Sequence, residues 1–223
     1  MKTKMPTKTL FFLFIGLLFL NGGAYGQQRT VKTPPKVTIK GTGNTSVSTF
    51  SDGTLTSSLL GLTLSVPVDF STISLAEAQV LDEAAKNIMF KDGEGKKEVE
   101  KAISRTIKVG IFTHKPYGEP NNSAIEIAAV RQGKGVTAKI ALAANVALMK
   151  NSNYTLTRSF PPTKIGANTF SIAEFEGTFA GIELTQRMYV IMNRGYSILI
   201  ASTYLNEEQM EINERVIATL KLN

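Results

Sequence analysis

The last quarter of the chain carries the pattern that most limits its possible folds. Three strand-like segments are separated by short polar turns: Thr169–Glu176, Ile182–Met192 and Tyr196–Tyr204. The third segment is apolar on both faces, so we expect it to be covered from both sides. Gly195 suits the left-handed position of a three-residue turn, Asn193-Arg194-Gly195. A helix starting at Asn206, with Gln209 completing its cap, follows this hairpin.

The preceding part of the chain alternates shorter strand patterns with two helical patterns. We expect strands in GTLTSS and in GLTLSVP, which Pro67 ends, and again at Thr106–Phe112 and Ser123–Val130. A helix begins at the capping box of Ser74 and Glu77 and runs through Ile88. Together these elements predict an α+β fold: an antiparallel β-sheet of about six to seven strands flanked by helices on both faces, an α/β/α sandwich.

The segment Thr137–Met149 forms a helix pattern that is apolar nearly all round, with Lys139 as its one charge. Such a helix usually lies in a core between other elements. The alternative is an exposed docking surface for a partner.

Residues 1–26 have the three-part pattern of a cleavable export signal. Three lysines precede an apolar run, Leu10–Leu20, and small residues then place a cleavage site before Gln27. A retained membrane anchor is the alternative, but a spanning helix needs about 20 apolar residues, more than this run provides. We therefore expect export and a mature chain, periplasmic or extracellular, with no transmembrane segment.

Residues 27–52 are rich in Thr, Ser, Gly and Pro, a composition that predicts a flexible basic linker. A short extended piece is possible at Val37–Ile39. The single domain then comprises residues 53–223. The chain has 25 Lys and Arg against 18 Asp and Glu. Seven of these basic residues precede residue 41, and the rest of the chain is neutral, so we expect no nucleic-acid partner.

The residue inventory excludes several chemistries. There is no cysteine, so thiol catalysis and thiolate metal sites are ruled out. The single histidine, His114, follows a strand in a loop, where it could act as a base. No G-x-S-x-G motif supplies a nucleophile for it, so a structural or surface role is the preferred interpretation.

Three carboxylates are candidates for a catalytic group. Glu174 and Glu176 are two apart on one strand and so lie about 6.8 Å apart on one face, with Glu183 on the neighbouring strand. Glycosidases use carboxylates at such spacings. A solvated hairpin end is the simpler explanation, since the chain has no Trp to stack against a sugar.

The remaining candidate motifs are incomplete. Asp92 and Glu94 lack the full twelve-residue calcium loop, and Gly133-Lys134-Gly135 lacks the spacing of a phosphate-binding loop. We therefore expect no catalytic residue, no metal site and no cofactor.

The strand pair ending in GLTLSVP and the ending RMYVIMNRGYSILIASTYLNEEQMEINERVIATLK together resemble the PsbP-like proteins, over residues 53–222. That superfamily includes extrinsic subunits of photosystem II and a Ran-binding nuclear import factor. The resemblance implies an α/β/α sandwich that serves as a binding or assembly module without chemistry of its own. It carries over no functional residue.

These observations favour an exported, non-catalytic binding or accessory protein of the cell envelope that engages a protein partner or a small ligand. A hydrolase that acts on envelope polymers through carboxylates is the alternative, and a purely structural envelope component is a third. A cleft lined by Glu174, Glu176 or Glu183 would favour the hydrolase. An exposed apolar patch on Ala138–Met149 would favour protein binding.

Overall fold

The computed structural model describes residues 37–40, 46–74, 77–78, 104–116, 119, 121–149, 154–179 and 182–223. Within these ranges lie the bounds of thirteen strands in two sheets and of two twelve-residue helices. The proposed export signal lies outside the described residues, as do Asp92 and Glu94.

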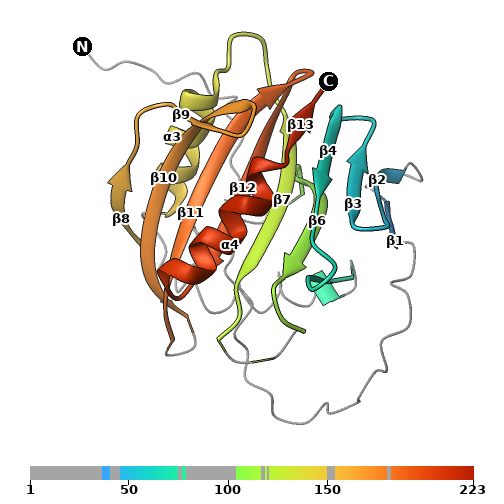
Figure 1. The fold of residues 1–223 in the computed structure, drawn as a ribbon. Helices are drawn as coiled ribbons and strands as arrows, with labels where there is room; N and C mark the ends of the chain where they lie inside the picture. The colour runs from blue at the N-terminus through green and yellow to red at the C-terminus, as the bar shows by residue number, and fades with distance from the viewer. Residues whose placement is uncertain are drawn as a thin grey trace.

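The larger sheet has eight strands, and all its pairings are antiparallel. Its central strands form long, regular ladders, and β12 lies between β11 and β7 (Figure 1). The order across the sheet is β5 (Ser71–Thr72), β6 (Ile107–Thr113), β7 (Ala124–Arg131), β12 (Tyr196–Tyr204), β11 (Ile182–Asn193), β10 (Asn168–Phe179) and β8 (Tyr154–Ser159), and β9 (Thr163–Ile165) pairs with β10.

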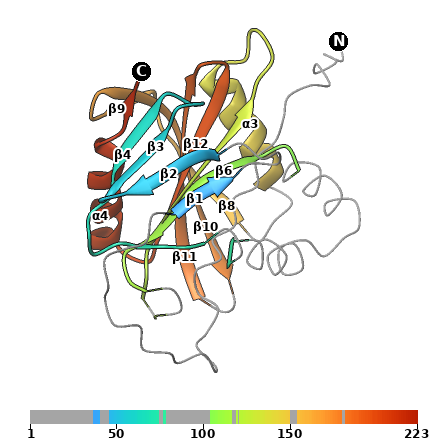
Figure 2. The ribbon, with the colours of Figure 1, turned by 90° about the vertical axis from the view of Figure 1, so that its right-hand side faces the viewer.

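The smaller sheet has five strands and lies over the β6, β7 and β12 part of the larger one (Figure 2). Its order is β1 (Val37–Lys40), β2 (Ser46–Ser51), β3 (Thr54–Ser57), β4 (Leu62–Ser65) and β13 (Lys221–Leu222). β13 lies at the C-terminal end of the described chain and β1 at its N-terminal end. Segments from both ends therefore form the two edges of this sheet.

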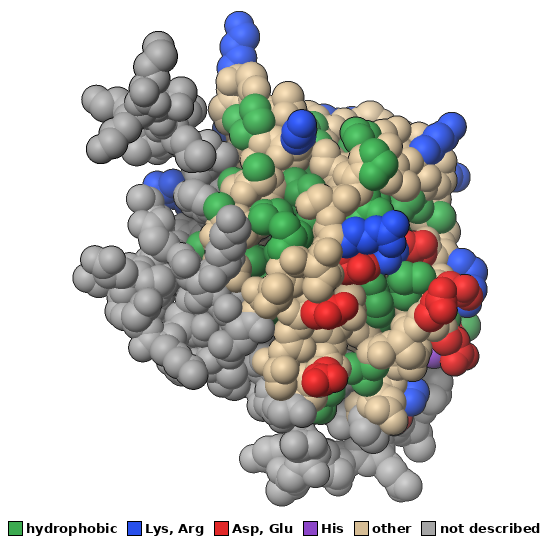
Figure 3. All heavy atoms as spheres, turned by 90° about the vertical axis from the view of Figure 1, so that its left-hand side faces the viewer, with side chains coloured by type: hydrophobic (Ala, Val, Ile, Leu, Met, Phe, Trp, Pro, Cys, Tyr) green, Lys and Arg blue, Asp and Glu red, His purple; other side chains and the backbone are tan. Residues whose placement is uncertain are grey.

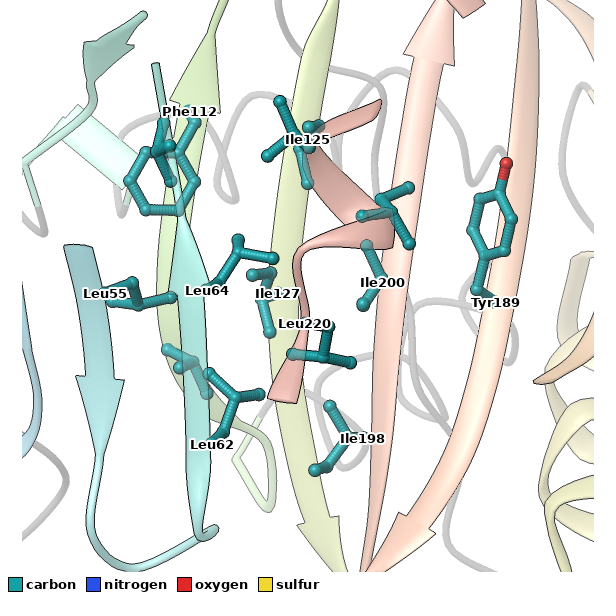
Figure 4. Packing of buried hydrophobic residues seen from close by; sticks show 14 of the residues in the cluster. Leu55, Leu62, Leu64, Phe112, Ile125, Ile127, Tyr189, Ile198, Ile200 and Leu220 are labelled. Atoms are coloured by element: carbon teal, nitrogen blue, oxygen red, sulfur yellow. The ribbon is translucent and has the colours of Figure 1, made fainter. Parts of the chain in front are cut away.

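Two apolar clusters fill the two sides of the larger sheet. On one side, Leu55 and Leu64 of the smaller sheet meet Ile127 and Ile200 of the larger sheet, together with Leu220 after the last helix (Figure 4). All five of these side chains are at most 1% exposed. On the other side, α3 (Ala138–Met149) packs on β10 and β11.

The second helix, α4 (Glu207–Ala218), shares its side of the larger sheet with the smaller sheet. The Asn206 side chain accepts a hydrogen bond from the Gln209 amide, so the predicted start and cap of this helix are confirmed. The capping box at Ser74 and Glu77 is also confirmed, because each side chain accepts a hydrogen bond from the other residue's amide. Ala78 continues this start, since its amide donates to the Ser74 carbonyl, and residues 79–88 of the predicted helix lie outside the described residues.

The prediction of an α/β/α sandwich is wrong. The described chain is mostly antiparallel strand, and a second sheet takes the place of a full helix layer on one side. The larger sheet also has eight strands instead of six or seven. Burial of β12 on both faces is confirmed, but residue pattern alone records that a strand is covered and not whether a helix or a strand covers it.

The N-terminal boundary of the folded part also differs from the expectation. Val37–Lys40 is a strand, as the extended piece suggested, and Ser46–Ser51 is a second strand of the smaller sheet. Phe50 is 6% exposed, and the Ser48 hydroxyl donates to the Val109 carbonyl of β6 at 2.7 Å. A boundary after residue 52 therefore falls inside the turn that joins β2 to β3.

Two tight turns explain how neighbouring strands connect. Asp52 and Gly53 both have positive φ and form a two-residue turn, a geometry for which Asp-Gly is a preferred pair. The turn between β11 and β12 also has two residues, Arg194 and Gly195, because Asn193 pairs with Tyr196. The expected three-residue turn is therefore one residue too long.

Candidate functional site

Glu174, the first of the three carboxylates considered for catalysis, is bound in an ion cluster. It lies directly opposite Arg187 in the ladder between β10 and β11. Arg187 donates to one Glu174 oxygen from Nε, at 2.7 Å, and from Nη2, and it donates from Nη1 to Glu214 of α4 at 2.7 Å. Only 14% of the Arg187 side chain and 15% of the Glu174 side chain are exposed.

Two tyrosines complete the cluster. The Tyr204 hydroxyl donates to Glu174 at 2.7 Å, and the Tyr189 hydroxyl donates to Glu214 at 2.9 Å. Burial, and then the hydrogen bonds to these carboxylates and their negative charge, raise the pKa of both tyrosines well above the ordinary value. Both phenols are therefore neutral donors across the physiological range.

Arg187 also lies within cation–π distance of two aromatic rings. Its guanidinium carbon lies 5.0 Å from the centre of the Phe160 ring and 5.9 Å from that of Tyr204, and Arg158 lies 4.6 Å from the same Phe160 ring. Burial by itself lowers the pKa of Arg187, but the interactions with Tyr189 and Glu174 outweigh it and raise that pKa. On this side of the molecule, basic, acidic and hydrophobic side chains lie next to one another (Figure 3).

The geometry gives no support to a carboxylate hydrolase. Arg187 and Tyr204 direct three hydrogen bonds at one Glu174 oxygen, so this carboxylate is engaged in contacts within the fold. Glu176 and Glu183 are exposed at the hairpin end, opposite Thr185 and Thr178 respectively. Glu174 and Glu176 share one face of the sheet, as predicted, and Glu183 on the neighbouring strand is on the same face, but the pocket described below is lined by none of them.

His114 lies in a pocket of about 510 Å³ beside α4. It follows β6, where its backbone N–H donates to the Ser123 carbonyl at 3.0 Å. Its ring centre is 5.4 Å from that of Phe70, and its Nε2 is 3.7 Å from a carboxylate oxygen of Asp69. The second distance is longer than a hydrogen bond, so the contact is electrostatic.

Apolar and polar side chains line the pocket in equal number, and we call the apolar ones its wall and the polar ones its rim. The loop after β4 supplies one side of it and the last two turns of α4 supply the other. The wall consists of Val66, Pro67, Phe70, Ile212 and Val216, and the rim consists of Ser65, Asp69, His114, Arg215 and Thr219. This combination of an apolar lining with a few polar groups is typical of small-molecule sites.

No sequence pattern predicted this pocket, although His114 was a candidate residue. Asp69 and Arg215 are 146 positions apart in the printed sequence, and only the packing of α4 against the loop after β4 brings them to one rim. The dipeptide Asp69-Phe70 follows a strand that a proline ends. Such a pattern is too common to predict a binding site.

Ser65 lines the same pocket as His114 and Asp69, so the residue types of a hydrolytic triad are present. The hydrogen bonds found among the described residues include none between the Ser65 hydroxyl and His114. Asp69 approaches Nε2, the nitrogen that would have to face a nucleophile, while its own side chain is 64% exposed. The arrangement is not that of an oriented triad.

The apolar helix α3 is a core helix, as preferred, but its outer face is open. Ala141, Leu148 and Met149 are buried on the sheet, whereas Ile140 is 45% exposed. Leu156 of the adjacent strand β8 is 38% exposed. One large exposed apolar side chain on the described helix does not make the patch that would favour protein binding.

Among the described residues, no group of three or more His, Asp or Glu side chains is placed to hold a metal ion. Gly133-Lys134-Gly135 is an exposed turn before α3. Neither α3 nor α4 is long and apolar enough to cross a bilayer.

No family model and no curated protein matches this chain, so the PsbP-like resemblance is not confirmed. Three solved structures are similar to it. A Bacteroides thetaiotaomicron protein has 16% identity and a TM-score of 0.40, covering 73% of this chain and 45% of its own. This chain thus spans less than half of that protein.

The second is LpqN of Mycobacterium tuberculosis, which is involved in cell envelope biogenesis; it has 12% identity and a TM-score of 0.41, covering 73% of this chain and 83% of its own. The third is PA94 of Pseudomonas aeruginosa, a protein of unknown function, with 13% identity and a TM-score of 0.43, covering 51% of this chain and 81% of its own. At such low identities and TM-scores the likeness says nothing about the ligand or activity of this chain.

Proposed function

We propose that this chain is an exported, non-catalytic binding protein of the cell envelope, and that its pocket beside α4 receives a small ligand with an apolar body. The observation that carries the proposal is the pocket itself. Its volume of about 510 Å³ lies within the range of ligand sites, which is about 300–1,000 Å³.

The chemistry around the pocket supports binding over catalysis. Half of its lining is apolar, and the His114 ring makes a tilted contact with Phe70, with no acid or nucleophile hydrogen-bonded to the ring among the described residues. The better-organised polar cluster, around Arg187, is bound internally and joins α4 to the sheet. Export rests on the leader pattern of residues 1–26, and a mature N-terminus at Gln27, found by mass spectrometry of the protein from its host envelope, would test it.

A neutral apolar dye tests the pocket. N-phenyl-1-naphthylamine should bind the mature protein saturably, with one site per chain and a rise in fluorescence. Ser65→Trp places a large ring in the pocket from an exposed strand position and should weaken dye binding about tenfold or more, because the loss of apolar contact area is worth over 1 kcal/mol.

Thr56→Trp is the matched control, since Thr56 is an exposed residue of the adjacent strand β3 outside the pocket lining. It should leave dye binding unchanged. Absence of saturable binding, or an equal effect of the two substitutions, would contradict the proposal.

A further inference from the structure

The rim of the pocket carries two opposite charges that are poorly neutralised. The Asp69 side chain is 64% exposed, and its contact with His114 is 3.7 Å long. The Arg215 side chain is 70% exposed, and the ion pair found for it among the described residues joins its Nη1 to a Glu211 oxygen at 4.0 Å. Both distances exceed those of hydrogen bonds, and exposed pairs of this kind contribute little.

These charges come from different elements. Asp69 belongs to the loop after β4 and Arg215 to the last turn of α4, and both line one pocket together with apolar side chains. A ligand that satisfied this rim would carry a cation for Asp69, an anion for Arg215 and an apolar body between or below them. Carboxylates bind arginine well because two N–H groups can face two oxygens.

We propose that the pocket binds zwitterionic apolar molecules of the amino-acid or short-peptide class. The free amino group faces Asp69, the free carboxylate faces Arg215, and an apolar side chain packs on Phe70 and Val216. This assignment rests on the proposed function and names the ligand class of the same site.

Other charged and polar groups near the rim affect how well the pocket would bind a zwitterion. Glu211 competes with the ligand carboxylate for Arg215, and the carbonyl end of α4 disfavours an anion there. The Thr219 hydroxyl lessens this second effect, because it donates to the Val216 carbonyl at 2.7 Å. His114 has ring nitrogens at the same rim and can offer a further hydrogen bond to either group.

Blocked peptides separate the two charge contacts. L-leucyl-L-leucine should displace the neutral dye from the wild-type protein. N-acetylation should weaken displacement about five- to tenfold, and C-terminal amidation should do the same, as expected for exposed charge-assisted hydrogen bonds. The Asp69→Asn variant should no longer distinguish the acetylated peptide from the free one, and Arg215→Gln should no longer distinguish the amide.

The controls are Asp52→Asn and Arg131→Gln, which remove the same charges from exposed positions outside the pocket lining. Both should keep the wild-type preference for free ends. If the dye binds but free and blocked peptides compete equally, or neither competes, the zwitterion assignment is overturned while the proposed function stands. If the dye itself does not bind, the proposed function fails first.

Discussion

Arg187 joins three elements through one side chain. It starts on β11, binds Glu174 on β10 and reaches Glu214 on α4, with the rings of Phe160 and Tyr204 near its guanidinium. Burying such a group is costly unless it is paired, and here each of its three nitrogens donates to a carboxylate. The cluster therefore ties α4 to the sheet.

Removal of this arginine should be strongly destabilising. Arg187→Met leaves two partly buried carboxylates on one site without a cation, and we expect a loss of about 3 kcal/mol in the free energy of unfolding, the low end for broken buried pairs. Arg158→Met keeps the methylene packing on Phe160 at an exposed position and should cost less than about 1 kcal/mol. Guanidinium denaturation of both variants measures the difference, and equal losses would show that the cluster is not what holds α4.

The buried tyrosines predict a loss of stability at high pH. Burial raises the pKa of Tyr154, Tyr189 and Tyr204 in the folded chain above the unfolded value of 10.0. Above about pH 10 the unfolded chain releases these protons and the folded chain keeps them, so the free energy of unfolding falls as pH rises, by up to about 1.4 kcal/mol per pH unit for each group. Below pH 10 these groups contribute no pH dependence.

Urea unfolding at pH 8 to 11 tests this expectation. Tyr204→Phe should reduce the alkaline slope relative to the wild type. A slope unaffected by Tyr204→Phe would mean that this phenol does not titrate with unfolding.

At the scale of elements, amide side chains attach α4 to the strands beneath it. Asn213 is fully buried, accepts a hydrogen bond from the Ser123 hydroxyl at 3.1 Å and donates to the Ser202 hydroxyl at 3.0 Å. Gln209 donates to the Asn121 carbonyl at 2.8 Å and accepts from the Leu205 amide. The helical pattern alone would place such polar residues at the surface, so this attachment was not predicted.

Asn213→Ala should destabilise the protein by about 2–3 kcal/mol, because it leaves two buried hydroxyls without their partner. Glu211→Ala, on the exposed side of the same helix, should stay within about 0.5 kcal/mol of the wild type. Thermal unfolding followed by circular dichroism at 222 nm would compare them, and a neutral effect of Asn213→Ala would refute the importance of the network.

For several elements, the residue pattern alone was enough to predict where the element begins and ends. The strands and α4 of the last quarter follow their predicted bounds closely, because their apolar side chains recur with the period of the element and their caps and turns are local. Strands β8 and β9 were missed. Five of the six β8 side chains are exposed, so its sequence shows no alternation between buried and solvent-facing positions.

At the scale of the molecule, the smaller sheet depends on both ends of the described chain. β13 pairs with β4, and the side chains of Asn193 and Arg194 donate to the carbonyls of Leu60 and Ser58. The β11–β12 turn is thereby tied to the turn between β3 and β4. Such long-range contacts make the two sheets one unit.

A chain that begins at Gly53, the boundary suggested by composition, should therefore be far less stable than one that begins at Val37. It lacks the buried side chains of Val47 and Phe50, each worth roughly 2 kcal/mol of burial, and it exposes the edge of β3. The two melting temperatures measure the effect. Equal values would show that β1 and β2 add nothing to the fold.

What the sequence determined by itself is local: the periodic strands of the closing hairpin, two helix starts set by capping side chains, the exclusion of thiol chemistry, and the expectation of a leader. What only the tertiary structure decided is which surfaces meet. A buried strand has the same apolar pattern under a helix as under another strand, so the second sheet had no separate signal. The pocket had none either, because Asp69, His114 and Arg215 become neighbours only when the loop after β4, the end of β6 and α4 pack together.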